Sequence, residues 1–397
     1  MRILEVIPSY LPATRYGGPV FSTHALSKAL AERGHAVEVY TTYGGQEPRT
    51  GLPPERSELD GVVVNYFKPS RSHRLAWAPD FERKLKTDIH RFDIVHLHTV
   101  FLWPTWCAAQ IARAYGLPYV ISPRGMLVKE LIKRRSPIAK SLWIALFEKK
   151  NLVRATAIHV TSSIEARDLA ALGWKLPKVA NIPNGIDWKP KGGEVSPEIS
   201  TATARGPYAL FFGRLSWKKG IDTLLDAFAR TPQGYLIIAG TDDEGLSVSL
   251  KRKAELLGLA DRVQIFPRTI EGADKYELFR SARLFVLASH SENFGNSVLE
   301  ALAAGLPVIV TPEVGAAEIV VEAQAGLVVP RDPIALSKAL EQLLNNEIEA
   351  REMGKRGPLY VRENCSWASV AGKMEALYSQ CMAQDANDVR TGVSAGK

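Results

Sequence analysis

The chain has 397 residues, which is more than one hydrophobic core usually supports, so the sequence predicts two domains. Its composition is that of an ordinary globular protein, and the net charge of +8 fits phosphorylated substrates, an anionic membrane surface or nucleic acid. RNA-binding signatures and zinc-finger spacings are missing from the sequence, which argues against nucleic acid, and no apolar run approaches the roughly 18 residues of a membrane span.

The first predicted unit is a strand over residues 3–7, a helix over about 20–33 and a strand over 37–41. The loop before the helix holds Gly17 and Gly18, whose backbone N–H groups could approach a phosphate at the helix N-terminus. A tight turn that needs glycine for its backbone conformation is the simpler explanation, and the residues alone favour it.

The alternation continues with helices that start near Phe81 and Pro104 and with strands over residues 62–66, 93–98, 119–122 and 158–162. Strands and helices of these lengths predict a parallel, doubly wound sheet. His96 and His98 interrupt one apolar strand, and we expect them on opposite faces of the sheet. His98 would lie at the carboxyl end, where ligand sites occur, although a strand histidine more often has a structural role.

Basic residues follow the strand over 119–122. Arg124 stands in the loop directly after this strand, where its permanent charge can bind a pyrophosphate, a sugar hydroxyl or an anionic acceptor. Residues 129–154 combine lysines and arginines with apolar side chains such as Leu142 and Leu146. They predict either a solvated helical pair or a surface that faces an anionic membrane with a lipid-phosphate-linked acceptor.

A second series of strands and helices begins after residues 188–206, which are rich in Pro, Gly, Ser and Thr and which we interpret as a linker. Helices are predicted over about 220–230, 246–257 and 275–282, and strands over 209–212, 235–239, 263–266, 284–288 and 308–310. The turn after the first strand carries Arg214 and Lys219 just before a helix, where cations oppose the macrodipole unless an anion binds. They could clamp a pyrophosphate, and a solvated basic loop is the alternative.

The stretch over residues 284–310 predicts a strand, a loop, a short helix and another strand. The helix is expected to begin near Asn296 or Ser297, with an amide or hydroxyl side chain as its cap, and to end at Gly305. In an open parallel sheet such a loop faces the ligand crevice, and the helix presents its unpaired N–H groups there.

Backbone amides from Asn293 through Phe294 and Gly295 to Asn296 could therefore bind a phosphate. Glu292 and Glu300 would repel that phosphate unless they accept hydrogen bonds from sugar or ribose hydroxyls, so the pattern favours a sugar nucleotide. Glutamates at a solvated helix start are also common by chance, so the flanking residues must add weight.

Those flanking residues support a resemblance. Ser291 to Gly295, Glu300-Ala301 and Gly305 to Val308 resemble the glutamate-x7-glutamate signature of retaining, nucleotide-sugar-dependent group 1 (GT4) glycosyltransferases. Gly213-Arg214-Leu215 with Lys219-Gly220 is similar to the family's diphosphate-binding motif. The resemblance implies an α/β fold of GT-B architecture, in which two doubly wound Rossmann-like domains face a cleft.

For the site, the resemblance implies that Arg214 and Lys219 stabilise the leaving diphosphate, that Glu292 contacts the sugar and that Glu300 contacts the ribose. Arg214, Lys219 and Glu292 are the expected catalytic residues. The expected donor-binding residues are these three with Glu300, the segment from Asn293 to Asn296, Gly17 and Gly18. No metal ligands and no cofactor are expected besides the nucleotide-sugar substrate, because cationic side chains and helix dipoles can replace a metal at the diphosphate.

Two departures from the family pattern are visible. Many members carry a histidine where Arg124 stands, and residues 313–318 lack the frequent Gly-Gly pair. The Pro-Arg-Gly-Met-Leu form around Arg124 resembles a subset tied to exopolysaccharide assembly. Arg124 and His98 are therefore candidate contacts to the acceptor or the sugar.

The composition and the resemblance together predict domain boundaries. The linker inferred over residues 188–206 separates an acceptor-side domain over 1–187 from a nucleotide-sugar-binding domain over 207–365, and the resemblance implies that a C-terminal helix over about 366–382 completes the first domain. Residues 386–397 are expected to be a flexible tail.

The sequence thus predicts a metal-independent, retaining hexosyltransferase that moves a sugar from a UDP-sugar, UDP-glucose first and GDP-mannose second, to a saccharide or polyprenyl-phosphate-linked saccharide. A sugar-nucleotide epimerase and a non-catalytic carbohydrate-binding or nucleic-acid-binding module are the alternatives from other classes. The 3 cysteines lie far apart and the N-terminal apolar run is too short for a signal peptide, so we expect a cytoplasmic protein with peripheral membrane contact.

Overall fold

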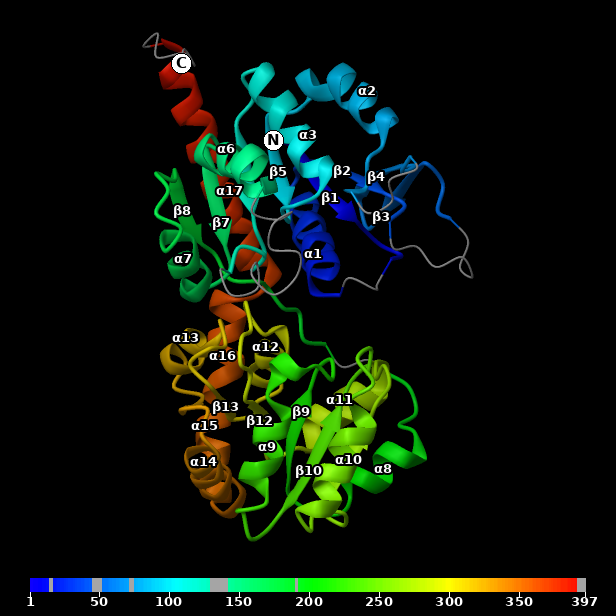
Figure 1. Ribbon diagram of the computed structural model, residues 1–397, viewed down its shortest axis with the longest axis vertical. Helices are drawn as coiled ribbons and strands as arrows, with labels where there is room; N and C mark the ends of the chain where they lie inside the picture. Colours follow the sequence, from blue (N-terminus) through cyan, green and yellow to red (C-terminus); the bar gives the residue numbers. More distant parts are fainter. Residues whose placement is uncertain (14–16, 45–51, 71–74, 129–141, 190–191, 391–397) are drawn as a thin grey trace. The chain divides into compact units, whose positions relative to one another are not determined.

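The computed structural model describes residues 1–13, 17–44, 52–70, 75–128, 142–189 and 192–390, and the chain forms two compact units (Figure 1). The first unit is Met1–Gly185 with Trp367–Lys397, and the second is Ile186–Ser366.

The first unit is built on a sheet of order β3-β4-β2-β1-β5-β6-β7-β8, in which only the β3–β4 pair is antiparallel. Its strands are β1 (Arg2–Ser9), β2 (Ala36–Thr42), β3 (Arg56–Leu59), β4 (Val62–Phe67), β5 (Ile94–His98), β6 (Tyr119–Ser122), β7 (Ala157–Val160) and β8 (Lys178–Asn181). Its helices include α1 (Gly18–Glu32), α2 (Pro79–Asp88), α3 (Trp103–Ala114), α6 (Lys149–Val153), α7 (Ser163–Ala170) and α17 (Trp367–Arg390).

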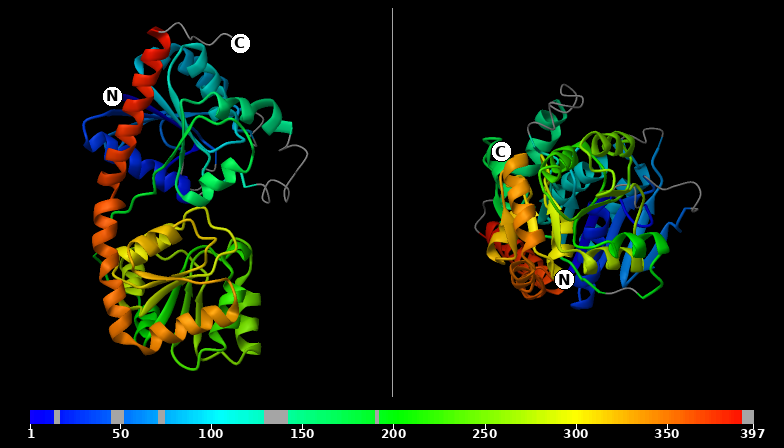
Figure 2. Two further views of the ribbon diagram at one scale, coloured as in Figure 1. Left: turned by 90° about the vertical axis from the view of Figure 1, so that its left-hand side faces the viewer. Right: turned by 90° about the horizontal axis from the view of Figure 1, so that it is seen from below.

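The C-terminal helix α17 belongs to this first unit and lies beside α1 (Figure 2). Its buried side chains recur at helical spacing and enter the core that covers one face of the sheet: Val370, Ala371, Met374, Leu377 and Tyr378. An ion pair of 2.6 Å joins Arg33 after α1 to Glu375 on α17. At Gly185 a Cβ atom would lie 2.5 Å from the Trp367 ring, so the chain needs glycine where it meets this helix.

The second unit has a fully parallel sheet of order β11-β10-β9-β12-β13-β14. Its strands are β9 (Tyr208–Phe212), β10 (Tyr235–Ala239), β11 (Val263–Phe266), β12 (Leu284–Leu287), β13 (Val308–Val310) and β14 (Gly326–Val328). Its helices are α8 (Pro197–Thr203), α9 (Ile221–Phe228), α10 (Ser247–Leu256), α11 (Gly272–Ser281), α12 (Asn296–Ala303), α13 (Ala317–Glu322), α14 (Pro333–Asn345), α15 (Glu347–Gly354) and α16 (Arg356–Asn364).

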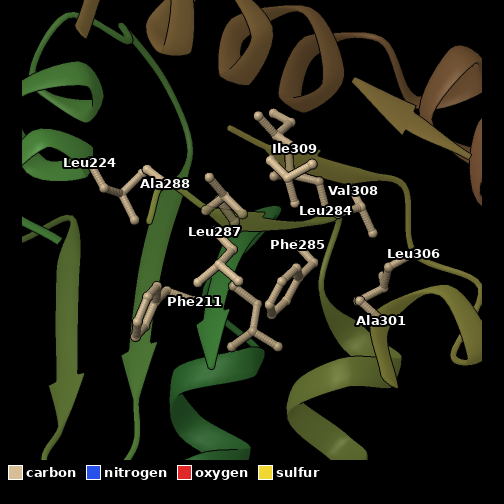
Figure 3. Packing of buried hydrophobic residues seen from close by; sticks show 14 of the residues in the cluster. Phe211, Leu224, Leu284, Phe285, Leu287, Ala288, Ala301, Leu306, Val308 and Ile309 are labelled. Carbon is tan, nitrogen blue, oxygen red and sulfur yellow. The ribbon is translucent and has the colours of Figure 1, made fainter. Parts of the chain in front are cut away.

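The central strands of the second unit are apolar on both faces, because helices cover both sides of a parallel sheet. Leu284, Phe285 and Leu287 on β12 are fully buried, together with Phe211 on β9 and Ile309 on β13 (Figure 3). This core fixes the strand ends from which the loops of the candidate site extend.

The structure confirms the predicted strands and most predicted helices to within a few residues, and it corrects the linker. Residues 197–203 form helix α8, and Ile199 and Ala202 are buried in the core of the second unit. The segment was predicted as a linker because of its Pro, Gly and Ser content, and the helical spacing of the two apolar residues Ile199 and Ala202 was overlooked.

Short elements were missed, namely β3, β8, β14, α7, α13, α15 and α16. Helix α17 also continues to Arg390, into the predicted tail, and residues 391–397 lie outside the described residues.

Candidate functional site

The candidate site of the second unit lies where the strand order reverses. The chain builds β9, β10 and β11 outward on one side and then returns with β12 to pair on the other side of β9. Loops at the carboxyl ends of β9 and β12 therefore flank a topological switch point, which is where open α/β sheets bind ligands. These are the loops over residues 213–220 and 288–296, the two segments that the sequence singled out.

An ion pair joins the two loops: the Lys219 ammonium donates to a carboxylate oxygen of Glu292. Both side chains are only about one-fifth exposed, at 18% and 20%. The backbones also approach closely, because a Cβ atom at Gly220, whose φ is 63°, would lie 2.0 Å from the Ala288 carbonyl oxygen. A larger residue cannot stand at position 220, so the glycine holds the cation loop against the glutamate loop.

Arg214 differs from Lys219 in its surroundings. Its side chain is 48% exposed, and its Nε lies 3.5 Å from a carboxylate oxygen of Asp243. An exposed pair of this kind contributes little to stability. Arg214 is therefore an exposed cation at the edge of the site, whereas Lys219 is held within it by Glu292.

The loop that carries Glu292 is held by residues 313–316, which the sequence analysis left without a role. Backbone hydrogen bonds connect Glu292 N to Glu313 O (3.1 Å), Gly315 N to Glu292 O (2.9 Å) and Ala316 N to Phe294 O (2.7 Å). A Cβ atom at Gly315 would lie 2.0 Å from the Asn293 carbonyl oxygen. Gly315 alone thus allows the close approach between these two segments of backbone. In the sequence, this segment was noticed only because it lacks the family's frequent Gly-Gly pair.

Helix α12 starts at Asn296 as predicted, but the expected side-chain cap is wrong. The N-cap is Gly295, whose φ of 97° is the left-handed conformation that favours glycine. Asn296 is the first helical residue. The backbone from Asn293 to Asn296 leads directly into a helix N-terminus, as an anion site requires.

Glu300 lies on α12, and its carboxylate accepts a 2.8 Å hydrogen bond from the Lys275 ammonium on α11. The same ammonium lies 5.1 Å from the centre of the Phe212 ring at the end of β9. Lys275 is a candidate site residue that the sequence analysis missed, because a lone lysine in an amphipathic helix gives no signal of its partner.

The first unit has its own switch point, between β1 and β5. The loop after β1 leads to Gly17, the N-cap of α1, with a φ of 63°, and to Gly18 as the first helical residue. The glycines thus lie at a helix start, and residues 14–16 are outside the described part of the chain.

His96 and His98 lie on the same face of the sheet, so the prediction of opposite faces is wrong. Side chains alternate with a period of two along a strand, which puts residues two apart together. Their ring centres are 4.1 Å apart, and Glu5 on β1, paired in register with His96, lies against both. All three side chains are fully buried, so His98 offers no surface for direct contact with the acceptor or the sugar.

Arg124 is the half-buried member of this group. One guanidinium nitrogen lies 3.1 Å from His98 Nδ1, and another donates a 2.9 Å hydrogen bond to the Asn184 side-chain carbonyl. Its backbone has a φ of 56°, and the following Gly125 N donates a 2.6 Å hydrogen bond to Glu165. Burial lowers the pKa of Arg124 from its ordinary value, an effect that Glu165 and Glu5 oppose.

Further hydrogen bonds link this group to the rest of the unit. His96 lies 2.7 Å from the Tyr378 hydroxyl on α17 and 2.7 Å from the Ser122 hydroxyl, which in turn lies 2.7 Å from His159. The sequence analysis missed Glu5, although a single acidic residue within a buried apolar strand indicates a buried polar contact.

It also missed Glu165, which the capping-box pattern Ser162-x-x-Glu165 at the start of α7 could have indicated.

Glu5, His96 and His98 bring one ligand atom each within 4.8 Å of one another, which is a spacing that a metal ion could bridge. Their surroundings do not fit a cation. His98 already faces the Arg124 guanidinium, His96 is shared by Tyr378 and Ser122, and Glu5 is bonded to His98. We therefore treat the cluster as a hydrogen-bonded network.

The basic stretch is described only in part, because residues 129–141 with Lys133, Arg134 and Arg135 lie outside the described residues. In the described part Leu142 and Leu146 are 58% and 56% exposed. Glu148 behind them is buried and accepts hydrogen bonds from Trp143 Nε1 (2.8 Å) and Phe101 N (2.7 Å), and burial raises its pKa. Among the described residues no helix is long and apolar enough to cross a membrane.

Comparison with known proteins identifies a family for the chain. A family model described as glycosyl transferases group 1 matches residues 194–359, and one described as a glycosyl transferase 4-like domain matches residues 17–185. A D-inositol 3-phosphate glycosyltransferase from Corynebacterium diphtheriae is 31% identical over 402 residues, which cover 94% of this chain and 92% of that protein. A GDP-mannose:cellobiosyl-diphosphopolyprenol alpha-mannosyltransferase from Xanthomonas campestris is 28% identical and covers 72% of this chain and 73% of its own.

Two solved structures have the same fold. Sucrose-phosphate synthase from Thermosynechococcus elongatus matches 97% of this chain and 100% of its own with a TM-score of 0.74 and 23% identity. Anabaena HepE in complex with UDP-glucose matches 96% of this chain and 100% of its own with a TM-score of 0.70 and 20% identity. The predicted GT-B fold of two parallel-sheet α/β units is thereby confirmed.

Proposed function

The chain belongs to the group 1 glycosyltransferases, and from this premise we propose that it transfers a hexose, with retention, from a UDP-sugar to a saccharide or polyprenyl-phosphate-linked saccharide. UDP-glucose is the first candidate donor. The observation that carries the proposal is the Lys219–Glu292 ion pair between the two switch-point loops of the second unit.

Lys219 and Arg214 neutralise the diphosphate as the bond to the sugar breaks. Lys219 is fixed by Glu292 and by the close backbone contact at Gly220, so it needs little reorganisation when negative charge develops on the leaving group. Arg214 is exposed and can close on the outer phosphate. The amides from Asn293 to Asn296 at the start of α12 bind phosphate or sugar oxygens.

Glu292 has two carboxylate oxygens. One accepts from Lys219, and the other accepts a hydrogen bond from a sugar hydroxyl. Glu300 is held by Lys275 through one oxygen and binds the ribose with the other. In each case a lysine offsets the carboxylate charge, so the phosphates of a donor meet less repulsion than two isolated glutamates would exert.

No residue in this arrangement is assigned as a covalent nucleophile. The acceptor hydroxyl attacks the anomeric carbon from the face that the diphosphate leaves, and a leaving phosphate oxygen takes the acceptor proton. The bond from the anomeric carbon to the diphosphate oxygen breaks as the bond to the acceptor oxygen forms. No metal and no cofactor enter the proposed reaction.

GDP-mannose is the second candidate donor, because the Xanthomonas campestris relative is named for GDP-mannose and for a diphosphopolyprenol-linked acceptor. That name also supports an acceptor of the same chemical class for this chain, within exopolysaccharide synthesis.

Peripheral binding to an anionic membrane fits such an acceptor. Leu142 and Leu146 are one helical turn apart and exposed, and Lys149 and Lys150 beside them are exposed as well. Sedimentation with phosphatidylglycerol vesicles should recover the wild type and much less of a Leu146→Glu variant. Equal recovery of both would contradict the membrane proposal.

A thermal-shift panel of UDP-glucose, GDP-mannose and ADP-glucose in EDTA tests the donor. A nucleotide sugar present at about 100 times its dissociation constant should stabilise the protein by roughly 2.7 kcal/mol. Stabilisation by UDP-glucose alone supports the proposal, whereas stabilisation by GDP-mannose alone transfers it to the second donor. If no member of the panel binds, or binding needs a metal that EDTA removes, the proposed donor chemistry is wrong.

A further inference from the structure

The group beneath Arg124 contains an acidic residue and a histidine that are completely buried. This is unusual, because fully buried charges are normally few and paired. Glu5 and His98 have no exposed surface, yet they lie behind a guanidinium that is half-buried at the carboxyl edge of the sheet. Two parts of the chain bond the Arg124 guanidinium directly, namely β5 through His98 and the segment after β8 through Asn184. β1 reaches it only through Glu5, which bonds His98, and α7 holds the loop through Glu165, which accepts from the N–H of the next residue, Gly125.

The hydrogen-bond pattern fixes the protonation of His98. A guanidinium can only donate, so His98 Nδ1 must be the acceptor and must carry no proton. The remaining nitrogen, Nε2, then carries the proton and donates it to the Glu5 carboxylate. The chain from Glu5 through His98 to Arg124 therefore holds one negative and one positive charge around a neutral imidazole.

Glu5 is held in turn from the other side, because the Tyr378 hydroxyl of α17 donates to it at 3.3 Å. The carboxylate, the imidazole and the guanidinium form a directed line from the core to the sheet edge. A carboxylate that fixes the tautomer and orientation of a histidine, so that the histidine can hold a third group, is a known catalytic arrangement.

Arg124 itself is strained and incompletely bonded. Its φ of 56° lies in a region that non-glycine residues rarely adopt, and its buried Nε has no hydrogen-bond partner among the described residues. Both features cost stability. They therefore indicate that the structure holds the Arg124 side chain for a function such as ligand binding.

We propose that Glu5 and His98 are positioning residues that hold the Arg124 guanidinium for the phosphate oxygens of a bound ligand. The proposal rests on the proposed function, which makes Arg124 a contact to an anionic substrate. The phosphate can belong to the donor nucleotide or to a lipid diphosphate on the acceptor, since a guanidinium binds either through paired N–H groups.

Two substitutions of His98 separate its two contacts. The side-chain oxygen of His98→Asn can take the position of Nδ1 and keep the bond to Arg124, whereas the longer amide of His98→Gln reaches the position of Nε2 and keeps only the bond to Glu5. His159→Asn is the matched control, because His159 is equally buried and bonds Ser122 and the Ile182 carbonyl, not Arg124.

The readout is the nitrogen spectrum of the intact protein with labelled arginine and histidine, with Arg124 signals assigned by their loss in Arg124→Lys. A held guanidinium rotates slowly and gives separate signals for its two terminal nitrogens. We expect separate signals in the wild type and in His159→Asn, and one averaged signal in His98→Gln. His98→Asn keeps the bond to Arg124 but loses the bond to Glu5, so its two signals should stay separate and exchange faster than in the wild type. Averaging in the wild type, or the same response in His98→Gln and His159→Asn, would overturn the positioning role.

The wild type alone also tests the idea if a variant fails to fold. His98 should be neutral at pH 7 with its proton on Nε2, and a proton on Nδ1 would overturn the proposal. Addition of inorganic pyrophosphate, UDP or farnesyl diphosphate should then shift the Arg124 Nε signal, and the ligand that shifts it identifies the donor or the lipid as the source. If UDP binds by calorimetry and none of the three moves that signal, Arg124 is held for structure only.

These measurements need no enzymatic activity. A donor panel without any binding would defeat the proposed function and leave the tautomer and rotation tests of Glu5 and His98 intact.

Discussion

Gly315 offers a sharp test of how the site is supported, because it is distant in sequence from every residue proposed to touch the donor. Its Cβ position in a Gly315→Ala variant lies 2.0 Å from the Asn293 carbonyl oxygen and 2.9 Å from Phe294 Cα. The obstacles are backbone atoms, so no side-chain rotation relieves the clash. The loop that carries Glu292 must move by roughly 1 Å, which is the kind of overpacking that costs about 1–3 kcal/mol.

A displacement of about 1 Å in a substrate-positioning loop can reduce turnover by roughly 100-fold. The three backbone hydrogen bonds that join residues 292–294 to residues 313–316 lengthen in the same movement. We therefore expect Gly315→Ala to lower both the melting temperature, by about 2–4 °C for each kcal/mol, and kcat/KM by about two orders of magnitude.

Gly326→Ala is the matched control. A Cβ atom at Gly326 also lies 2.0 Å from a carbonyl oxygen, that of Val308, but this contact is at the amino ends of β13 and β14, opposite the site. The control should lose comparable stability and keep its turnover once folded. If the two variants lose activity equally at equal fraction folded, the 313–316 segment does not position the Glu292 loop and the reasoning is refuted.

Three further outcomes are expected. Glu300→Gln should weaken nucleotide binding about tenfold in titration calorimetry, because the variant loses the charged hydrogen bond to Lys275 and makes a weaker contact to the ribose. Unchanged affinity would show that Glu300 does not contact the nucleotide. Glu165→Ala should cost about 2–4 kcal/mol in urea unfolding, because it leaves the half-buried Gly125 N–H and the buried Thr161 N–H without their carboxylate, and a loss below about 1 kcal/mol would contradict that account. Burial lowers the pKa of His98 to about 3 from 6.5, so between these values the unfolded chain binds a proton that the folded chain does not. Stability should therefore fall by about 1.6 kcal/mol from pH 6.5 to 5 through this residue. The slope of stability against pH should be shallower in His98→Asn, and an equal slope would argue against a neutral buried imidazole.

The sequence predicted the fold well because buried parallel strands leave a strong signal. Apolar runs such as Leu284 to Leu287, followed by glycine-containing loops and helices of regular period, predict buried strands of a parallel sheet that is covered by helices. The two loops of the candidate site were placed at the sheet edge for the same reason, since Lys219 and Glu292 each follow a strand at its carboxyl end.

The missed features depend on distance in three dimensions. The pairing of Lys275 with Glu300 and the approach of Gly315 to Asn293 join helices and loops whose register no local pattern encodes. The linker error had a local cause, because turn-forming residues outnumbered the two buried side chains of α8. The error with His96 and His98 was one of geometry, since strand periodicity already puts them on one face.

The diphosphate clamp of Lys219 is the central claim, and calorimetric titration with UDP in EDTA tests it most directly. Lys219→Ala should weaken UDP binding by at least about tenfold, which is the loss of one charge-assisted hydrogen bond. Lys253→Ala removes a lysine–carboxylate pair with Asp226 in the same unit, 2.7 Å in length, and should leave the affinity unchanged. If Lys219→Ala binds UDP as tightly as wild type, the switch-point loops of the second unit do not bind the donor diphosphate and the account is contradicted.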